Sequence, residues 1–274
     1  FKQKTAYEIR NCDWSSDVCS SDLKVQLFER SSKVGGQARL AAATPGRSEL
    51  GTIVEWLEQQ CVAEGVTITT GRELTLDQLL EDDADLFVIA TGASHPGLPT
   101  PGRGMSEEAI GLLQSHLRLA SLADALGGAV SDGTVAVYDA GADWPGFNAA
   151  RVLAERGLKV HYITPEPHPG VALEVTNWRL EYQALSDLGV EFHPVTQVVG
   201  SVPGGLTICR GYSASTHTLP SIDTLVWIDA PVPTDVLSTP LRMSGRTVLT
   251  LGDAYAPRSI EQAILDARLA LIDR

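Results

Sequence analysis

The residues best suited to chemistry lie in one stretch near the N-terminus, residues 24–37, KVQLFERSSKVGGQ. Its apolar run over 25–28 predicts a buried parallel strand that ends at an acid, Glu29. In a dinucleotide-binding fold, an acid at that position hydrogen-bonds the ribose of an adenosine. Gly35 and Gly36 have no Cβ, so the backbone there can approach a ligand closely. We therefore interpret this stretch as the second strand of a dinucleotide-binding unit.

The segment before this strand does not contain the glycine-rich turn that such a unit needs ahead of its acid. Residues 1–23 include no glycine, show no hydrophobic periodicity and have no apolar signal-peptide core. The run DWSSDVCSSDL looks like a translated sequencing adapter joined to a reading frame, so we expect a non-native leader; a disordered natural leader is the alternative. On either interpretation we expect a fold truncated at its N-terminus, with the first strand and glycine-rich loop missing.

Two further turns follow predicted strands and could line the same cofactor. The strand predicted over 86–89 ends at Ala90, Thr91 and Gly92, where small residues permit a close backbone approach. The strand predicted over 248–251 ends at Gly252 and Asp253, with a helix expected from about residue 259. An acid there could hydrogen-bond a ribityl hydroxyl in front of the helix, or act only as a turn or cap residue.

A second strand–turn–helix–strand unit is predicted over residues 135–163. Its turn contains Gly141 and Gly146, but Asp139 precedes them and Pro145 interrupts them. An acid at such a turn repels a pyrophosphate, and proline has no backbone N–H to offer. The pattern thus indicates a βαβ fold and disfavours tight NAD(P)H binding at this turn.

No other residue pattern indicates catalysis or a metal site. Cys61 and Cys209, the cysteines outside the leader, have no CxxC spacing, so we expect neither a metal site nor a disulfide there. We therefore expect the protein to be located in a reducing cytoplasm. Four histidines lack ligand spacing and are expected to be surface or core residues: His161, His168, His193 and His217.

Composition excludes several classes of protein. The chain has 274 residues, 43% of them hydrophobic and 20% charged, which are values of globular proteins. A net charge of −13 argues against nucleic-acid binding and against an anionic membrane surface, since both need a basic patch. No apolar run reaches the length that spans a bilayer.

Three runs together carry a specific resemblance: ERSSKVGGQARLAAATPGRSELGTIVEWL, DLFVIATGA and LGDAYAPRSIEQAI. They resemble the carboxyl-terminal half of the flavin oxidoreductases that include 2,4-dienoyl-CoA reductase and trimethylamine dehydrogenase (NADH:flavin oxidoreductases of the old yellow enzyme type). The resemblance implies that Glu29 is the adenosine-ribose acid. It places these residues along the flavin or adenine-nucleotide path: Gly36, Gln37, Thr91, Gly92 and Asp253. Their neighbours complete the candidate cofactor contacts: Arg30, Gly35, Arg47, Ala90 and Gly252. Arg47 could equally be a surface charge, or a cation directed at a phosphate or a neighbouring domain.

The resemblance also implies the domain organisation. We expect an α/β fold, a glutathione-reductase-like pair of Rossmann-type three-layer domains. The expected segments are a leader (1–23), a first FAD- or ADP-binding part (24–100), a crossover (101–133), an inserted NAD(P)-type domain (134–230) and a last FAD-binding part (231–274). An amino-terminal TIM barrel with FMN and a 4Fe-4S cluster, which this sequence does not contain, would be the partner half.

Three functions follow as hypotheses. The first is an enzyme part in which FAD relays electrons to or from the FMN of the barrel, with NAD(P)H as a possible donor and an enoyl-CoA or a methylated amine as substrate. The second is a structural module that binds FAD or ADP without redox work. The third is an inactive truncation. None of them assigns a catalytic residue or a metal ligand to this sequence, and an oligomer is possible.

Overall fold

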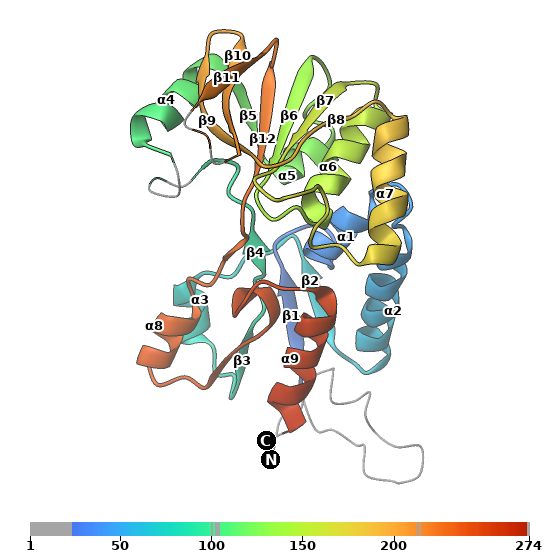
Figure 1. The fold of residues 1–274 in the computed structure, drawn as a ribbon. Coiled ribbons are helices and arrows are strands. Elements are labelled where there is room, and N and C mark those ends of the chain that lie inside the picture. The colour runs from blue at the N-terminus through green and yellow to red at the C-terminus, as the bar shows by residue number, and fades with distance from the viewer. Residues whose placement is uncertain (1–23, 100, 102–104, 212, 214, 273–274) are drawn as a thin grey trace. The chain divides into compact units, whose positions relative to one another are not determined.

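The computed structural model describes residues 24–99, 101, 105–211, 213 and 215–272, so the leader expected at residues 1–23 lies outside the described residues. The chain divides into two compact units (Figure 1). The described part of the first unit comprises residues 24–39, Glu49–Ser94 and residues 232–272, and the second unit comprises Leu40–Ser48 and His95–Pro231. Each unit is considered by itself.

Among the described residues of the first unit, the strands form three two-stranded sheets. Two sheets are parallel and one is antiparallel: β1 (Gln26–Glu29) with β2 (Thr67–Thr70), β14 (Val248–Thr250) with β3 (Phe87–Ile89), and β13 (Val232–Pro233) with β4 (Ala93–Ser94). The strands predicted over 25–28, 86–89 and 248–251 are therefore present. β1 is shifted by one residue, β3 begins one residue later than predicted, and β14 ends one residue earlier. Parallel pairing places the ends of β3 and β14 at one edge, because parallel strands run in the same direction.

Helices of the first unit pack beside these short sheets. They are α2 (Glu49–Ala63), α3 (Leu76–Glu81), α8 (Ser238–Met243), a 3₁₀ turn (Gly252–Ala254) and α9 (Ile260–Ile272), and α1 (Gly36–Ala42) begins in the first unit and ends in the second. Thr75 starts α3 with a reciprocal capping box to Gln78, which satisfies two backbone N–H groups. Leu79, Phe87 and Leu241 form the centre of a small core.

In the second unit, the described residues form a five-stranded parallel sheet and a three-stranded antiparallel sheet. The parallel strands, in spatial order, are β5 (Arg118–Ala120), β12 (Thr224–Ile228), β6 (Thr134–Asp139), β7 (Lys159–Ile163) and β8 (Glu191–His193). The antiparallel strands, also in spatial order, are β11 (Thr216–Pro220), β10 (Gly205–Arg210) and β9 (Thr196–Val202). Its helices are α4 (Glu107–His116), α5 (Leu122–Gly127), α6 (Trp144–Glu155) and α7 (Val175–Asp187).

The parallel sheet is buried on both faces, which explains its continuous apolar strands. Along β6, Val135 and Val137 face a core that also contains residues of α5 and α6. Ala136 and Tyr138 face a second core built with α4 and the antiparallel sheet. The ring of Tyr138 stacks on Trp227 of β12 with centroids 4.1 Å apart. The unit thus has three layers, with the parallel sheet in the middle.

The structure differs from the sequence-based expectation in several short elements. Residues 101–133, expected as a crossover, contribute α4, β5 and α5 to the second unit, and β5 is an edge strand of its sheet. The sequence pattern also did not indicate α1, α8 or β11. These elements are too short or too polar for periodicity to reveal them. Among the described residues, no helix combines the length and apolar character that crossing a membrane requires.

Candidate functional site

Glu29, the predicted ribose acid, lies at the carboxyl end of β1. One carboxylate oxygen accepts a hydrogen bond from the backbone N–H of Ser31, 2.7 Å away. The backbone carbonyl of Glu29 accepts from the N–H of Arg72, whose guanidinium lies 5.2 Å from the ring of Phe28. Arg30 follows in the turn and is exposed. These contacts hold the Glu29 backbone in place and orient its half-buried carboxylate.

The structural reason for a glycine is different at positions 35 and 36. Gly35 has a φ of +110°, and a Cβ there would lie 2.4 Å from Cγ1 of Val54 on α2. Gly36 has a φ of +45°, and a Cβ there would meet no atom within 4 Å. Close packing of the chain on α2 therefore accounts for Gly35, whereas the space beside Gly36 is open.

We expect Gly35→Ala to destabilise the first unit by about 2 kcal/mol, because the new methyl group collides with Val54 on a backbone that L residues rarely adopt. Gly36→Ala is the matched control and should cost about 1 kcal/mol, from its positive φ alone. Amide hydrogen exchange of α2, followed by mass spectrometry, measures both. Equal protection in the two variants would contradict the packing role of Gly35.

Contacts join the predicted stretches at the ends of β1 and β3. The side-chain amide of Gln37 donates a hydrogen bond to the carbonyl of Ala93. Thr91 donates its hydroxyl to the carbonyl of Thr234 at 2.7 Å, and the backbone N–H of Thr234 donates to the carbonyl of Gly92 at 2.9 Å. The turn after β3, including the exposed Ala90, is thereby fixed by residues from three parts of the sequence.

Asp253 lies beside this turn because β14 pairs with β3. The N–H of Leu251 continues the pairing by donating to the carbonyl of Ile89 at 3.0 Å. Gly252 is buried, and Asp253 is half-buried in the 3₁₀ turn that follows. One carboxylate oxygen of Asp253 accepts from the N–H of Arg258 at 3.1 Å. Asp253 therefore orders the entry to α9 and lies at the same sheet edge as Ala90–Gly92.

Arg47 belongs to the second unit and stacks on an aromatic ring there. Its guanidinium carbon lies 3.6 Å from the ring centroid of Trp144, a cation–π contact. Burial lowers the pKa of Arg47, and nearby carboxylates, Glu181 foremost, act in the opposite direction. Its Nη1 atom is buried with no hydrogen-bond partner among the described residues. The contact with Trp144 thus accounts for the position of Arg47, and its role toward a cofactor stays a prediction.

The turn of the βαβ unit in the second unit is occupied by its own acid. Asp139 is 2% exposed and accepts hydrogen bonds from the N–H groups of Gly141 and Asp143, both at 3.1 Å. The hydroxyl of Tyr162 donates to the same carboxylate at 2.6 Å. Gly146, in the first turns of α6, leaves room for it, since a Cβ there would lie 1.9 Å from the Asp139 carboxylate.

These contacts satisfy N–H groups that a pyrophosphate would otherwise need. Burial raises the pKa of Asp139 to about 6, so the group is mostly ionised at neutral pH. Asp143 caps the start of α6 by accepting from the N–H of Trp144 at 2.7 Å, and burial raises its pKa as well. Two carboxyl groups at one turn disfavour an anionic ligand there.

Tyr162 and Thr234 are the contributors to these two turns that sequence reasoning missed. Tyr162 lies on β7, where the sequence pattern predicts a buried strand but not which turn the hydroxyl of Tyr162 reaches. Thr234 follows β13, which has two residues and no sequence signal. Both residues reach their turns through pairing between strands far apart in the sequence.

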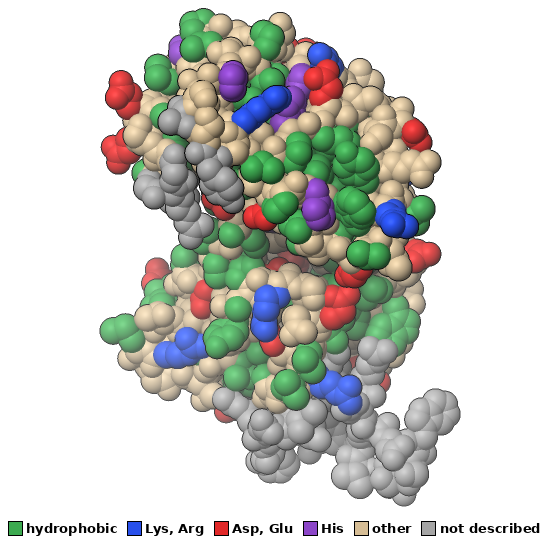
Figure 2. All heavy atoms as spheres, in the orientation of Figure 1, with side chains coloured by type: hydrophobic (Ala, Val, Ile, Leu, Met, Phe, Trp, Pro, Cys, Tyr) green, Lys and Arg blue, Asp and Glu red, His purple; other side chains and the backbone are tan. Residues whose placement is uncertain are grey.

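The surface shows no concentration of basic side chains on the face drawn in Figure 2, where lysine and arginine stand singly among acidic, polar and apolar groups.

Comparison with known proteins shows relatives among the oxidoreductases. No family model matches the chain. It is 29% identical over 163 residues to an N,N-dimethylglycine/sarcosine dehydrogenase of Chromohalobacter salexigens, covering 59% of the chain and 23% of that protein. It is 26% identical over 280 residues to a probable N-methylproline demethylase of Rhizobium meliloti. That match covers 91% of this chain and 40% of the demethylase. The chain thus spans less than half the length of each of these relatives.

Solved structures show the fold. Histamine dehydrogenase from Rhizobium sp. 4-9 matches with a TM-score of 0.79 at 20% identity, over 91% of this chain and 40% of that one. Thioredoxin reductase of T. acidophilum matches with a TM-score of 0.60 at 16% identity. That match covers 92% of this chain and 89% of the reductase chain. The predicted α/β fold with a parallel sheet is confirmed, and it is the fold of glutathione-reductase-like FAD/NAD(P) oxidoreductases.

Proposed function

We propose that this chain is the nucleotide-binding part of a flavin-dependent oxidoreductase, and that its first unit binds FAD or ADP. The observation that carries the proposal is the grouping at the ends of β3 and β14. There the turn Ala90–Gly92 and Asp253 share a sheet edge, and Gln37 bonds to Ala93. Ligands of open α/β sheets bind at the carboxyl ends of the strands.

Each residue would have a defined task toward the nucleotide. The residues fit such a ligand, because Glu29 presents a half-buried carboxylate and the space beside Gly36 is open. Glu29 would accept hydrogen bonds from the adenosine ribose, and Asp253 those from a ribityl hydroxyl or ribose. The exposed Ala90 and Thr91 would let the backbone approach the ligand. Bound FAD would supply the redox chemistry, and the chain would bind and orient it.

The sheets of the first unit support a proposal about its missing strand. Within the described residues, β1 pairs only with β2 and β3 pairs only with β14, so each has one edge without a strand partner. We place a strand encoded upstream of residue 24 between them, followed by the glycine-rich loop that holds the pyrophosphate. Free strand edges also favour aggregation, so the chain by itself should be poorly soluble and inactive.

The parent enzyme would contain a TIM-barrel half with FMN and a 4Fe-4S cluster, and the first unit would exchange electrons with it. The chain spans 40% or less of its two named relatives, which leaves room for such a half. The occupied turn at Asp139 favours parents whose second unit does not bind NAD(P)H. Together with relatives named as a dimethylglycine/sarcosine dehydrogenase and an N-methylproline demethylase, it favours a methylated amine over an enoyl-CoA as substrate.

The alternative function is a structural module that holds ADP or FAD without redox work. The same Asp139 turn favours it, because reduction through the second unit needs a nicotinamide site there. Mixing the purified parent with NADH or NADPH in a stopped-flow instrument separates the two. Because NAD(P)H could also reduce the FMN of the barrel directly, only reduction of a second flavin equivalent, that of FAD, would exclude the structural module.

The test of the proposed function is the cofactor content of the parent gene product, recovered by reading upstream of residue 24. The purified protein is denatured and its released nucleotides are separated by chromatography. We expect FMN together with FAD or ADP, and about tenfold less of the adenine nucleotide in Glu29→Ala, since losing a ribose contact of about 1.4 kcal/mol gives that factor. The exposed acid Glu73, replaced by alanine, is the control. A parent without any adenine nucleotide would overturn the proposal.

A further inference from the structure

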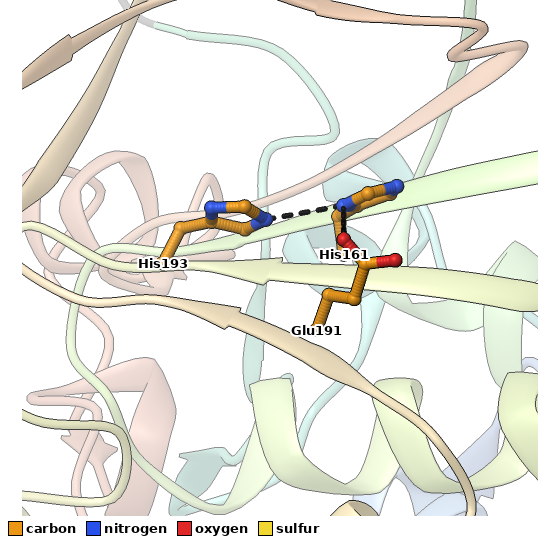
Figure 3. A group of neighbouring side chains, drawn as sticks. All are labelled: His161, Glu191 and His193. Atoms are coloured by element: carbon orange, nitrogen blue, oxygen red, sulfur yellow. Dashed lines mark hydrogen bonds and ion pairs between the residues drawn. The ribbon is translucent and has the colours of Figure 1, made fainter.

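Three potential metal ligands gather on one face of the parallel sheet in the second unit. They lie on β7 and β8, whereas Asp139 ends β6. His161 lies on β7, and Glu191 and His193 lie on the edge strand β8 (Figure 3). The parallel register pairs His161 with Glu191 and Ile163 with His193, so the three side chains project from the same face of the sheet. The two histidines are 5% and 8% exposed.

Two of the three separations between their ligand atoms match those of a tetrahedral cation. His161 Nδ1 is 3.1 Å from His193 Nε2 and 3.4 Å from a carboxylate oxygen of Glu191, and the atoms that the three residues offer all lie within 4.8 Å of one another. A tetrahedral zinc ion with bonds of about 2.0–2.1 Å separates its ligand atoms by about 3.3 Å. A cation therefore fits between these groups after small side-chain movements.

We propose that His161, Glu191 and His193 bind a divalent first-row transition-metal ion, with zinc as the principal candidate and water as the fourth ligand. Two imidazoles and one carboxylate suit zinc, nickel or copper, whereas magnesium and calcium prefer oxygen ligands alone. Three protein ligands with one open position match the ligand count of hydrolytic and other catalytic zinc sites.

The neighbouring groups are compatible with this ligand set. Both imidazoles are buried, and burial lowers the pKa of His161 and of His193. Lys159 contacts the Oε1 atom of Glu191 at 3.1 Å, while Oε2 faces His161. Glu191 can thus bind the ion through Oε2 and keep its contact with Lys159.

The contact between Arg210 and His193 opposes binding of the ion and must be broken when the ion binds. Arg210 Nη2 lies 3.4 Å from His193 Nδ1, which then accepts and leaves the ring proton on Nε2, shared with His161 Nδ1. A metal ion on Nε2 requires the neutral tautomer of His193 that carries its proton on Nδ1. The ring proton therefore moves from Nε2 to Nδ1 by exchange with solvent, and Arg210, a donor that faces Nδ1, must turn away. Without a metal, the two histidines share a hydrogen bond and Glu191 forms its ion pair with Lys159, which is the competing account.

Titration with Co²⁺ tests the proposal, because its visible absorption reports a tetrahedral site directly. The full chain, or the parent if the chain is insoluble, is first stripped with EDTA and dialysed. We expect one Co²⁺ per chain with a tetrahedral spectrum, displaced by one equivalent of ZnCl₂. His161→Gln and His193→Gln should each weaken binding at least tenfold. The exposed His217, replaced by glutamine, is the matched control and should bind like the wild type.

Glu191→Gln keeps the test independent of folding, since that side chain is half exposed and its replacement preserves shape. It should also weaken binding about tenfold while circular dichroism stays unchanged. Wild-type protein that binds no Co²⁺, or a double His161→Gln/His193→Gln variant that binds as well as wild type, would overturn the proposal. The outcome does not depend on flavin content, so failure here leaves the proposed function untouched.

Discussion

Replacing Gly146 with alanine is expected to lower the free energy of unfolding of the second unit by about 4 kcal/mol. The new Cβ would lie 1.9 Å from a carboxylate oxygen of Asp139 and 2.6 Å from its Cβ. Asp139 has little freedom to move, because it is buried and held by Tyr162 and two backbone N–H groups. Overpacking costs about 1–3 kcal/mol, and weakening the bonds of a buried charged group adds a similar amount.

Gly141→Ala is the matched control within the same turn. A Cβ at that position would lie 3.9 Å from Asp139, an ordinary contact, so we expect a change below about 1 kcal/mol. Urea denaturation measures both variants in a background with Trp14 and Trp56 replaced by phenylalanine. The tryptophans that remain are then all in the second unit: Trp144, Trp178 and Trp227. Equal stability of the two variants would show that Gly146 is not needed to accommodate Asp139.

The second large effect is a pH dependence of stability that arises from Asp139. Burial raises its pKa from 3.8 to about 6, so the folded chain binds more protons than the unfolded chain between these values. Stability from this group is therefore lost as pH rises from about 4 to about 7. A shift of about two pH units corresponds to about 3 kcal/mol, at 1.36 kcal/mol per unit.

The measurement is the difference in unfolding free energy between wild type and Asp139→Asn at pH 4 and pH 7.5. Taking the difference removes the titration of the other acids in a chain that has 34 aspartates and glutamates. We expect wild type to lose about 2 kcal/mol relative to the variant between these pH values, since part of the effect has already been lost by pH 4. A difference that stays constant or grows with pH would mean that the three hydrogen bonds to Asp139 outweigh its burial.

Both predictions concern one property of the second unit, namely that it supplies its own anion where a dinucleotide-binding turn would accept a phosphate. The glycine that such turns use for ligand approach is used here to accommodate a carboxylate. A βαβ unit can therefore keep its strand order and helix packing while its ligand site is replaced by an internal contact, since fold and site are separable.

Local patterns predicted the buried strands and the turns that follow them. Residues 135–138 and 225–228 are continuous apolar runs because a parallel strand with both faces covered needs no polar alternation. The acid at the end of β6 and the proline at the start of α6 likewise indicated a turn unsuited to pyrophosphate. Such features are local, so a single sequence contains them.

Contacts between distant segments were decided only by the tertiary structure. Gly35 is required by Val54, and Asp139 is held by Tyr162, a partner 23 residues along the chain. His161 and His193 meet although 32 residues separate them, because β7 and β8 pair in parallel at one register. A one-residue slip of that register would turn His193 to the opposite face, and no local pattern in the sequence specifies it.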